Sequence, residues 1–420
     1  MNAFREKICQ AVEEHTQDLV SAVQDLVRYP TTMGQEKEAQ EYYGRCLEEA
    51  GAKVDLWEPD MEVLKKHPAF VSDRKDFHGS PNVAGYFPGQ GGGRSLILSG
   101  HMDVVEPGNG KWTYPPFSAT LVDGKIYGRG AADMKAGLAA NLMAMKALKE
   151  AGVNLKGDVT ILSVIDEEWG SAGILSAVLK GYKADAAIVT EPTGMELFMA
   201  SNAGIFFKVH VYGKAAHGGV SYQGVNSIYK AMKIINQIRE LEESRRLRVT
   251  HPLYKDAPIA FCAGVNAIHA GGWPGIVAEE TVLEGRICAA PHETVEEVKA
   301  ELEAWVARAA QSDEWMKDHP PLVEYYPCRW NSSNVELDHP LGLILQENTQ
   351  VITGTKAPMT GMPASSDSGT LQRYANTPAI NFGCPPLSLA HQTDEYVEVA
   401  ALKEFTKVLA LSILDWCGEA

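Results

Sequence analysis

The chain has 420 residues, of which 45% are hydrophobic and 22% charged, and this composition excludes a disordered or fibrous protein. Thirty-eight Lys and Arg stand against 54 Asp and Glu, a net charge of −16, which disfavours nucleic acid and anionic membranes as partners and favours a small-molecule substrate. Because the chain is longer than a single hydrophobic core usually grows, we expect two domains.

The N-terminal segment and the cysteines indicate where the protein works. Residues 1–17 are charged throughout and lack the apolar core of a signal peptide, and no later run approaches the length of a membrane span. The seven cysteines are dispersed, without a C-x-x-C pair, which is typical of reduced thiols. The sequence therefore predicts a cytoplasmic protein whose active site contains no thiol.

The first half of the chain alternates helical and strand patterns. Apolar residues at spacings of three and four predict a helix, a turn and a second helix over 5–54, with Gly51 as the stop. Further on, 134–152 predicts another helix, and short apolar runs predict strands at 82–87, 95–100, 158–165 and 185–190. This alternation is typical of a mainly parallel sheet covered by helices, an α/β fold.

The pattern changes after Glu191. Strands are predicted at 204–213, 258–268, 275–290 and 322–329, with helices at 227–243 and 295–309. This β-α-β-β-α-β order is ferredoxin-like. A helix at 339–354 and a strand at 377–383 then resume the first pattern. We therefore predict a catalytic domain of residues 1–201 plus 332–420, interrupted by an inserted domain at 202–331.

Polar residues directly follow the predicted strands. His101 and Asp103 come after the strand at 95–100 and lie on one side of it, because strand side chains repeat every two residues. An imidazole can bind metal through one nitrogen while a carboxylate holds the other. The simpler interpretation is a polar loop.

Carboxylates occupy comparable places further along. Asp133 stands between a glycine-rich turn and a helix start, where it would either cap the helix or bridge two metal ions about 3.5–4 Å apart. Three acids, Asp166, Glu167 and Glu168, end the strand at 158–165, where unpaired charge is costly. If the strand continues, Glu167 and Glu168 point to opposite sides, so one would face metal and the other the substrate water as a general base. The alternative is that all three acids decorate the start of the next helix.

Glu191 and His391 also follow strands. Strand ends at one edge of a parallel sheet converge, and ligands usually bind in the crevice there. Two metal sites sharing Asp133 could therefore be built from His101, Asp133, Glu168, Glu191 and His391. Two imidazoles and three carboxylates without a thiolate suit zinc, with cobalt or manganese as alternatives.

Six motifs in order carry a resemblance that spans nearly the whole chain: SGHMDVV, GRGAADMKAG, IDEEWGSAG, TEPTG, GKAAHGG and HQTDEYV. They resemble those of the di-zinc aminoacylase family that includes acetylornithine deacetylase, succinyl-diaminopimelate desuccinylase, aminoacylase and bacterial glutamate carboxypeptidase. The resemblance implies a metal-dependent amidohydrolase that removes a short acyl group from a small N-acyl amino acid or amine, with two Zn²⁺ per subunit, in a homodimer.

The resemblance also implies roles for individual residues. Asp133 would bridge the two metals, with His101 and Glu191 on one and Glu168 and His391 on the other. Glu167 would be the general base and Asp103 the carboxylate that orients the histidine ligand, and the bond between Asp133 and Met134 would be cis. In the inserted domain, which becomes a lid and dimerisation domain, His217 would reach the partner subunit's active site to stabilise the oxyanion. Asn266 and Arg286 would contact substrate, although Arg286 fits a surface-paired strand arginine equally well.

The substrate is less well defined. ASSDSGT, with Asp367, stands where many relatives have Thr-Asp-Ala, and SNAG at 201–204 replaces an arginine-bearing turn, so a free carboxylate on the substrate is not assumed. Segments 56–82 and 312–320 look most similar to the acetylornithine deacetylase-like branch, which also contains a formyl-aminopyrimidine deformylase of thiamin salvage. That deformylase is the alternative, and a dipeptidase or carboxypeptidase is less favoured.

Other protein classes fit the sequence less well. SSDSG suggests a serine hydrolase, but no G-x-S-x-G elbow is present. GQGGGRS precedes a strand and not a helix, so it is read as a loop and not as a phosphate site. A catalytically dead metal-binding relative should have lost ligands or base, whereas all of these positions are filled.

Overall fold

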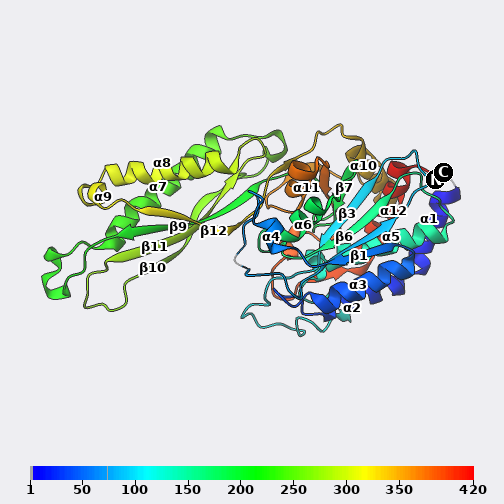
Figure 1. The fold of residues 1–420 in the computed structure, drawn as a ribbon, viewed down its shortest axis with the longest axis horizontal. Coiled ribbons are helices and arrows are strands. Elements are labelled where there is room, and N and C mark those ends of the chain that lie inside the picture. The colour runs from blue at the N-terminus through cyan, green and yellow to red at the C-terminus, as the bar shows by residue number, and fades with distance from the viewer. Residues whose placement is uncertain (1–2, 73) are drawn as a thin grey trace. The chain divides into compact units, whose positions relative to one another are not determined.

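The computed structural model describes residues 3–72 and 74–420, and contacts within the chain divide it into two compact units (Figure 1). Unit 1 comprises Met1–Ala200, Ser333–Met362 and Ser366–Ala420. Unit 2 comprises Ser201–Ser332 and Pro363–Ser365. Unit 1 is thus assembled from segments on both sides of unit 2 in the sequence.

Unit 1 is built on a large sheet whose centre is parallel. The strand order is β1 (Lys53–Trp57), β2 (Asn82–Phe87), β6 (Val159–Val164), β3 (Leu96–His101), β7 (Ala186–Val189), β15 (Ala379–Asn381), β8 (Leu197–Ser201) and β13 (Ser333–Asn334), with β14 (Met359–Met362) paired to β8. The pairs β6–β3, β3–β7 and β7–β15 are parallel, whereas β1, β2 and β8 join antiparallel. β3 and β7 are buried along their whole length, which explains their unbroken apolar runs.

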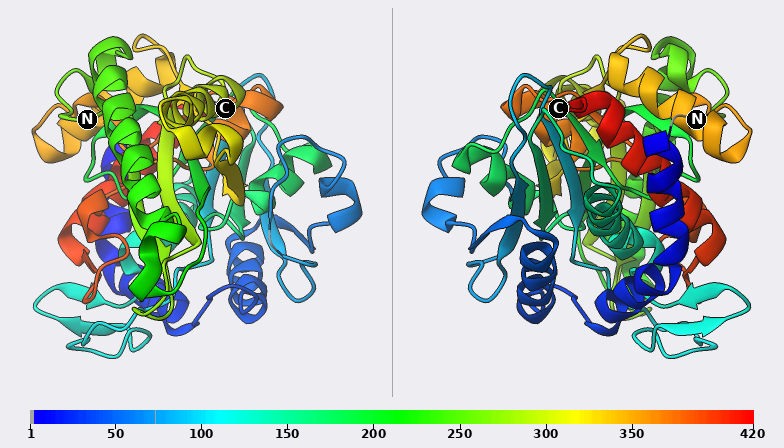
Figure 2. Two further views of the ribbon diagram at one scale, coloured as in Figure 1. Left: turned by 90° about the vertical axis from the view of Figure 1, so that its left-hand side faces the viewer. Right: turned by 90° about the vertical axis from the view of Figure 1, so that its right-hand side faces the viewer.

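Helices cover both faces of this sheet (Figure 2). One face carries α3 (Lys37–Ala50), α5 (Ala136–Glu150) and α12 (Val399–Cys417), with α1 (Ala3–Glu14), α2 (Thr16–Arg28) and α10 (Pro340–Thr353) packed on them. The other face carries α6 (Ala172–Lys180) and α11 (Ser368–Ala375), with short α4 (Met61–Leu64) beside α6. The helix predicted at the N-terminus is divided in two at His15, and Gly51 ends α3 with a φ of 105°, as predicted.

A small antiparallel sheet lies beside the large one in unit 1. It consists of β4 (Thr120–Val122), β5 (Lys125–Tyr127) and β16 (Tyr396–Glu398), with β5 in the middle. The irregular turn η1 (Ala131–Lys135) follows β5 closely and contains a cis peptide bond between Asp133 and Met134, as the family resemblance implied. The 3₁₀ turn η4 (Leu387–Leu389) precedes β16.

Unit 2 has the predicted β-α-β-β-α-β order (Figure 1). Its elements are β9 (Ala203–Tyr212), the turn η2 (Gly218–Gln223), α7 (Ser227–Arg248), the turn η3 (Pro252–Tyr254), β10 (Ala263–Ala270), β11 (Glu280–Ala289), α8 (Val295–Gln311), α9 (Glu314–Asp318) and β12 (Leu322–Arg329). The strands form an antiparallel sheet in the order β10-β11-β9-β12. Alternate residues of β9, including Phe207 and Val209, are buried with apolar residues of α7 and α8.

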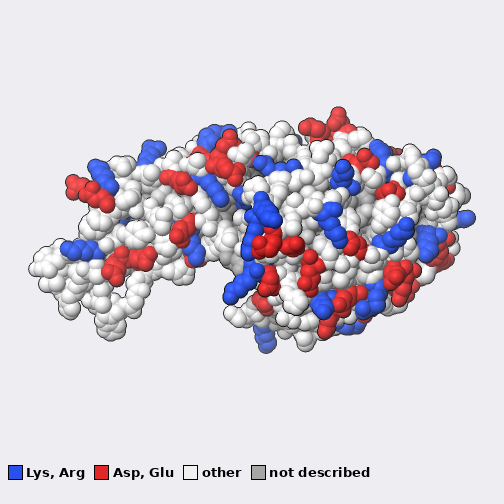
Figure 3. Space-filling model, in the orientation of Figure 1, with Lys and Arg blue, Asp and Glu red and all other residues white. Residues whose placement is uncertain are grey.

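None of the helices in the described part of the chain has the length and apolar character that a membrane crossing needs. On the face shown in Figure 3, Lys and Arg side chains are interspersed with Asp and Glu. No broad basic area of the kind that nucleic acid would require is visible on that face.

Candidate active site

His101 ends β3 and is almost completely buried, at 1% exposure. Its Nδ1 lies 2.8 Å from the backbone oxygen of Asp103, and its Nε2 lies 3.0 Å from Oδ1 of Asp133. A proton on Nδ1 would be donated to that backbone oxygen, which leaves the Nε2 lone pair directed at the centre of the cluster. The chain therefore orients this imidazole as a ligating histidine is usually oriented.

The carboxylate of Asp103, predicted to orient the histidine ligand, lies closer to the acidic turn than to the imidazole. It lies 3.7 Å from Nδ1 of His101, farther than the backbone oxygen of the same residue. Its two oxygens accept hydrogen bonds from the backbone N–H groups of Glu167 and Glu168, at 3.3 and 3.1 Å. Asp103 thus holds the imidazole through its main chain and the following acidic turn through its side chain.

The three acids after β6 lie in a turn and do not continue the strand. β6 ends at Val164, and Asp166 adopts the left-handed region with a φ of 66°. The helix α6 begins only at Ala172 and has no acid in its first turn, so decoration of a helix start is excluded. Asp166 turns away to Nη1 of Arg74, at 3.3 Å. The assumption that strand alternation separates Glu167 from Glu168 was therefore wrong, because the strand stops before them.

Glu167, Glu168 and Glu191 converge on the two imidazoles. The nearest oxygens of Glu167 and Glu191 each lie 4.0 Å from Nε2 of His101. Glu168 lies 3.0 Å from Nε2 of His391. His101 with Glu167 and Glu191, and His101 with Asp133 and Glu168, form two groups whose ligand atoms lie close enough to hold a metal ion.

Asp133 stands between the two histidines. Its Oδ1 is 3.0 Å from Nε2 of His101, and its Oδ2 is 3.4 Å from Nε2 of His391. One carboxylate therefore presents one oxygen to each imidazole, which is the arrangement that a bridging ligand requires. The irregular backbone of η1 places this side chain there.

Burial and mutual repulsion dominate the electrostatics of the cluster. Burial raises the pKa of Glu167 and of Glu191 well above the ordinary value, and neighbouring carboxylates add to the effect. Burial would also raise the pKa of Asp133, but its hydrogen bonds with His101 and His391 outweigh burial and lower it. The hydrogen bonds of His391 with Asp133 and Glu168 raise its pKa to about 10. A divalent cation beside these carboxylates would favour their charged form.

The donor set fits divalent metal ions. Oε1 of Glu191 is buried and finds no hydrogen-bond partner among the described residues. Carboxylate oxygens and imidazole nitrogens are ligands that zinc, cobalt and manganese accept, and Asp133 supplies an oxygen to each side. The residues whose ligand atoms lie close enough to hold ions are His101, Asp133, Glu167, Glu168 and Glu191, and Nε2 of His391 lies 3.0 Å from Glu168.

Asp367 directly precedes α11 and has no role predicted from the sequence. Its side chain is buried, Oδ1 has no partner within the described residues, and burial raises its pKa to about 7. Its charge adds to the raised pKa of both Glu167 and Glu191. The only signal in the sequence was its place in the ASSDSGT motif, which was examined for substrate contacts alone.

Arg129 and Glu395 were also missed, and both are buried. Oε1 of Glu395 accepts the backbone N–H groups of Ala132 and Asp133, at 2.9 and 3.1 Å, while Oε2 accepts Nη1 of Arg129 at 2.5 Å. Arg129 also donates to the backbone oxygen of His391 at 3.3 Å. One ion pair thereby ties the loop of Asp133 to the loop of His391. In the sequence, these two residues could have been noticed only by their positions within motifs, Glu395 at the end of HQTDE and Arg129 in GRG.

The remaining predicted site residues belong to unit 2. Nδ1 of His217 accepts the backbone N–H of Gly219 at 3.1 Å. Asn266 is exposed, at an irregularity of β10 where the register with β11 shifts. Arg286 is half-buried on β11, with its Nε atom lacking a partner among described residues and its guanidinium 5.9 Å from the ring of Phe206. Their roles stay predictions.

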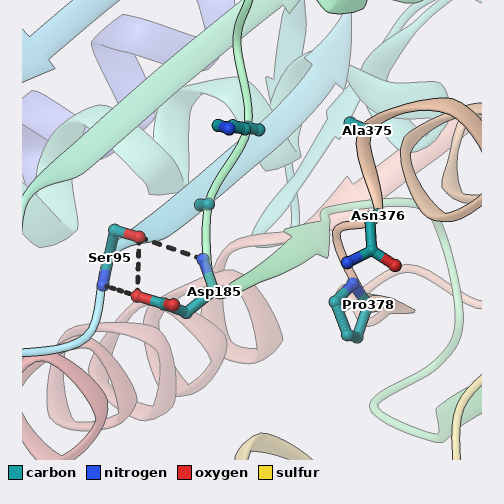
Figure 4. A pocket seen from close by; sticks show the side chains of 7 residues that line it. Ser95, Asp185, Ala375, Asn376 and Pro378 are labelled. Carbon is teal, nitrogen blue, oxygen red and sulfur yellow. Dashed lines mark hydrogen bonds between the residues drawn. The ribbon is translucent and has the colours of Figure 1, made fainter.

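A separate hollow of about 520 Å³ lies at the opposite ends of the parallel strands (Figure 4). Ser95 precedes β3 and Asp185 precedes β7, and Asp185 accepts hydrogen bonds from both the N–H and the hydroxyl of Ser95. This carboxylate ties two strand starts together. Asp185 is the only carboxylate among the described residues that line the hollow, so it has no cluster of imidazoles and carboxylates like the one at the carboxyl ends of the same strands.

A buried histidine, a second, half-exposed histidine and several buried carboxylates gathered beyond the ends of parallel strands are typical of metal-dependent α/β hydrolases. A comparison with known families matches residues 97–415 to Peptidase family M20/M25/M40. The chain belongs to this family, and it is a hydrolase that acts on amide bonds.

Known proteins resemble the chain over different lengths. N-formyl-4-amino-5-aminomethyl-2-methylpyrimidine deformylase of Halalkalibacterium halodurans is 32% identical over 438 aligned residues, covering 98% of this chain and 97% of that protein. A "Probable succinyl-diaminopimelate desuccinylase" of Staphylococcus aureus is 41% identical over 148 residues, 34% of this chain and 36% of that protein. The structure of a Bacillus subtilis protein described as a dinuclear metal binding peptidase of family M20 has a TM-score of 0.64 at 16% identity, covering 96% and 99% of the two chains. That likeness shows the fold.

Proposed function

We propose that this chain hydrolyses the linear amide bond of a small N-acyl amine that carries a short acyl group, with two zinc ions per subunit. The observation that carries the proposal is Asp133, which presents one oxygen to His101 and the other to His391. We assign Asp133 as the bridging ligand, His101 and Glu191 to one metal, and Glu168 and His391 to the other.

The chain's own groups would move the protons. Two bound divalent cations would supply Lewis acidity, which would lower the pKa of a water molecule and polarise the amide carbonyl. Glu167 takes the proton of the attacking water and later delivers it to the leaving amine. Burial raises the pKa of this carboxyl, which suits a group that must hold a proton between the two steps. Asp103 positions Glu167 by accepting its backbone N–H.

We propose formyl as the first acyl group to test. The deformylase of Halalkalibacterium halodurans matches this chain over nearly its full length, whereas the desuccinylase match covers about a third. An N-formyl aminopyrimidine is therefore the best-supported substrate class. Acetylornithine-like and N-succinyl amines come next, and Asn266 and Arg286 would contact whichever amine is bound.

A homodimer would complete the site. His217 of a second copy would stabilise the oxyanion that forms on the substrate carbonyl. Support comes from unit 2, where large apolar side chains are exposed on α7 and around the turn between β10 and β11, with Trp273 69% and Tyr229 67% exposed. Such apolar surface commonly marks a protein interface. A mass measurement in solution, by light scattering, tests this assembly.

A hydrolysis screen tests the function. The metal-replete chain is offered N-formyl, N-acetyl and N-succinyl amines, including the formyl-aminopyrimidine and acetylornithine, and release of the free amine is followed. Turnover lost in Glu167→Ala but kept in Glu49→Gln, an exposed helix position in α3, supports the proposal. Silence across the panel, with two metals bound, contradicts it and favours a dipeptidase or a non-catalytic binder.

A further inference from the structure

Two cysteines of unit 2 face each other across neighbouring strands. Cys262 directly precedes β10 and Cys288 lies on β11, and Ala263 is paired with Ile287 in the antiparallel register. The backbone N–H of Cys288 donates to the backbone oxygen of Cys262 at 2.9 Å. The two residues are therefore directly opposite, and their Sγ atoms lie 3.3 Å apart.

This placement is suited to a covalent bond between the sulfurs. Residues directly opposite in an antiparallel pair have Cα atoms about 4.5–5.5 Å apart, within the range of about 4.4–6.8 Å found across disulfides. An S–S bond is about 2.05 Å long, so the sulfurs must approach by little more than an ångström. Rotation of the side chains supplies such a shift without moving the strands.

The surroundings of Cys288 fix its position. Its backbone oxygen accepts Nη2 of Arg245 at 2.9 Å, and that guanidinium is completely buried. Arg245 is paired with Glu293 at 2.6 Å and with Glu301 at 2.5 Å, so both α7 and α8 hold this part of β11. Cys288 itself is 1% exposed. It can therefore react only with a partner already beside it.

Cys262 has the properties of the thiol that reacts first. It is partly exposed, unlike Cys288. The hydrogen bond with Cys288 lowers the pKa of Cys262 to about 6, and the nearby guanidinium of Arg286 also lowers it. Burial and the carboxylate of Glu242 act in the opposite direction and raise this pKa. Arg286 is two residues before Cys288 and so lies on the same side of β11. A thiolate next to a cation is the reactive form of cysteine.

We propose that Cys262 and Cys288 are a site of reversible oxidation, at which a hydroperoxide converts the two thiols into one disulfide. The Cys262 thiolate attacks a peroxide oxygen, the O–O bond breaks, and Cys262 becomes a sulfenic acid while water or an alcohol leaves. Cys288 then attacks that sulfur and expels water as the S–S bond forms. The pair gives up two electrons and two protons, and the peroxide is reduced. The proposal is independent of the amide hydrolysis.

The test uses the full-length chain in its metal-loaded form. Reduced protein is treated with hydrogen peroxide, quenched, unfolded, alkylated, digested and analysed by mass spectrometry. We expect two fewer alkylated thiols among the seven, a peptide pair joined through Cys262 and Cys288, and full reversal by dithiothreitol. Cys288→Ser should instead leave a sulfenic acid at Cys262 that dimedone traps, and Cys46→Ser should behave as the unaltered chain.

Three outcomes overturn the proposal. The first is a Cys262 that stays alkylatable at peroxide concentrations that oxidise a free thiol in solution. The second is over-oxidation of Cys262 to the sulfinic acid with Cys288 still reduced, which would show that Cys288 does not resolve the sulfenic acid. The third is a disulfide that joins either residue to another cysteine. The peroxide treatment of the unaltered chain needs no substitution, so a variant that fails to fold does not affect that measurement.

Discussion

The two histidines that face Asp133 are supported in different ways. His101 ends a buried central strand, and its side chain is 1% exposed. His391 lies in a loop with a φ of 63°, and its side chain is 51% exposed. A strand fixes the first imidazole directly, whereas the second depends on the Arg129–Glu395 ion pair, which binds its backbone. The half of the candidate metal centre that contains His101 is therefore part of the core. The half that contains His391 is held to the core by an ion pair.

The largest effect should come from Glu167, which belongs to neither half as a proposed ligand. We expect Glu167→Gln to lower kcat by about 10²–10⁴-fold, because a general base contributes about that much. Both metals should remain bound, as measured by elemental analysis of the dialysed protein. Loss of metal together with activity would show that Glu167 is a ligand and not a base.

Two carboxylates that support loops of the site, Asp103 and Glu395, can be replaced separately. Asp103→Asn removes a carboxylate that accepts two N–H groups of the Glu167–Glu168 turn, and Glu395→Gln removes the one that holds the Asp133 loop. We expect each to weaken the binding of metal by about 10–100-fold, as such supporting groups typically do. The visible absorption of the Co²⁺-loaded protein should change differently in the two variants. Identical spectra would contradict two independent supports.

Chelation should distinguish the halves without any substitution. Because His391 is half exposed and His101 is buried, we expect a chelator to remove one metal equivalent several-fold faster than the other. Stopped-flow release with a metal indicator measures both rates. In Glu395→Gln both phases should become faster, because Glu395 holds the shared ligand Asp133, and the fast phase should change more, because His391 also loses its support through Arg129. A single phase for both ions would remove the basis of the comparison.

The smallest expected effect is the uptake and release of protons. Burial raises the pKa of Glu168 and Glu191, so the metal-free chain holds protons that a metal must displace. Affinity should therefore fall as the pH is lowered, and metal binding should release protons into a weakly buffered solution. Calorimetry in buffers of different ionisation enthalpy counts the protons released. An affinity that does not fall as the pH is lowered would contradict the raised pKa values.

The residues of the site were more predictable from the sequence than their supports. His101, Asp133 and His391 can be selected from the sequence by their residue type, their position after a strand or turn, and the order of the motifs that contain them. The turn at Asp166 was not predictable, because a left-handed backbone at a non-glycine residue leaves no pattern in hydrophobicity. The pairing of Arg129 with Glu395 joins residues far apart in the chain, and no local signal reports such a contact.

The fold shows the same limit. The α/β alternation and the β-α-β-β-α-β order were confirmed, because each depends on local periodicity. The antiparallel pairing of β2 with β6 was not foreseen, since a buried strand carries the same apolar run whichever direction its neighbour takes. Likewise, reduced thiols were predicted, but the approach of Cys262 to Cys288 depends on strand register.

The position of β15 has a consequence for synthesis of the protein. β15 lies between β7 and β8 in the large sheet, although it is the second-last strand in the sequence. During translation, β7 and β8 must wait for residues 379–381 while all of unit 2 emerges and can fold first. His391 leaves the ribosome later still. The nascent chain therefore carries an unfinished sheet until residues 379–381 have emerged, and the proposed ligand set stays incomplete until His391 follows.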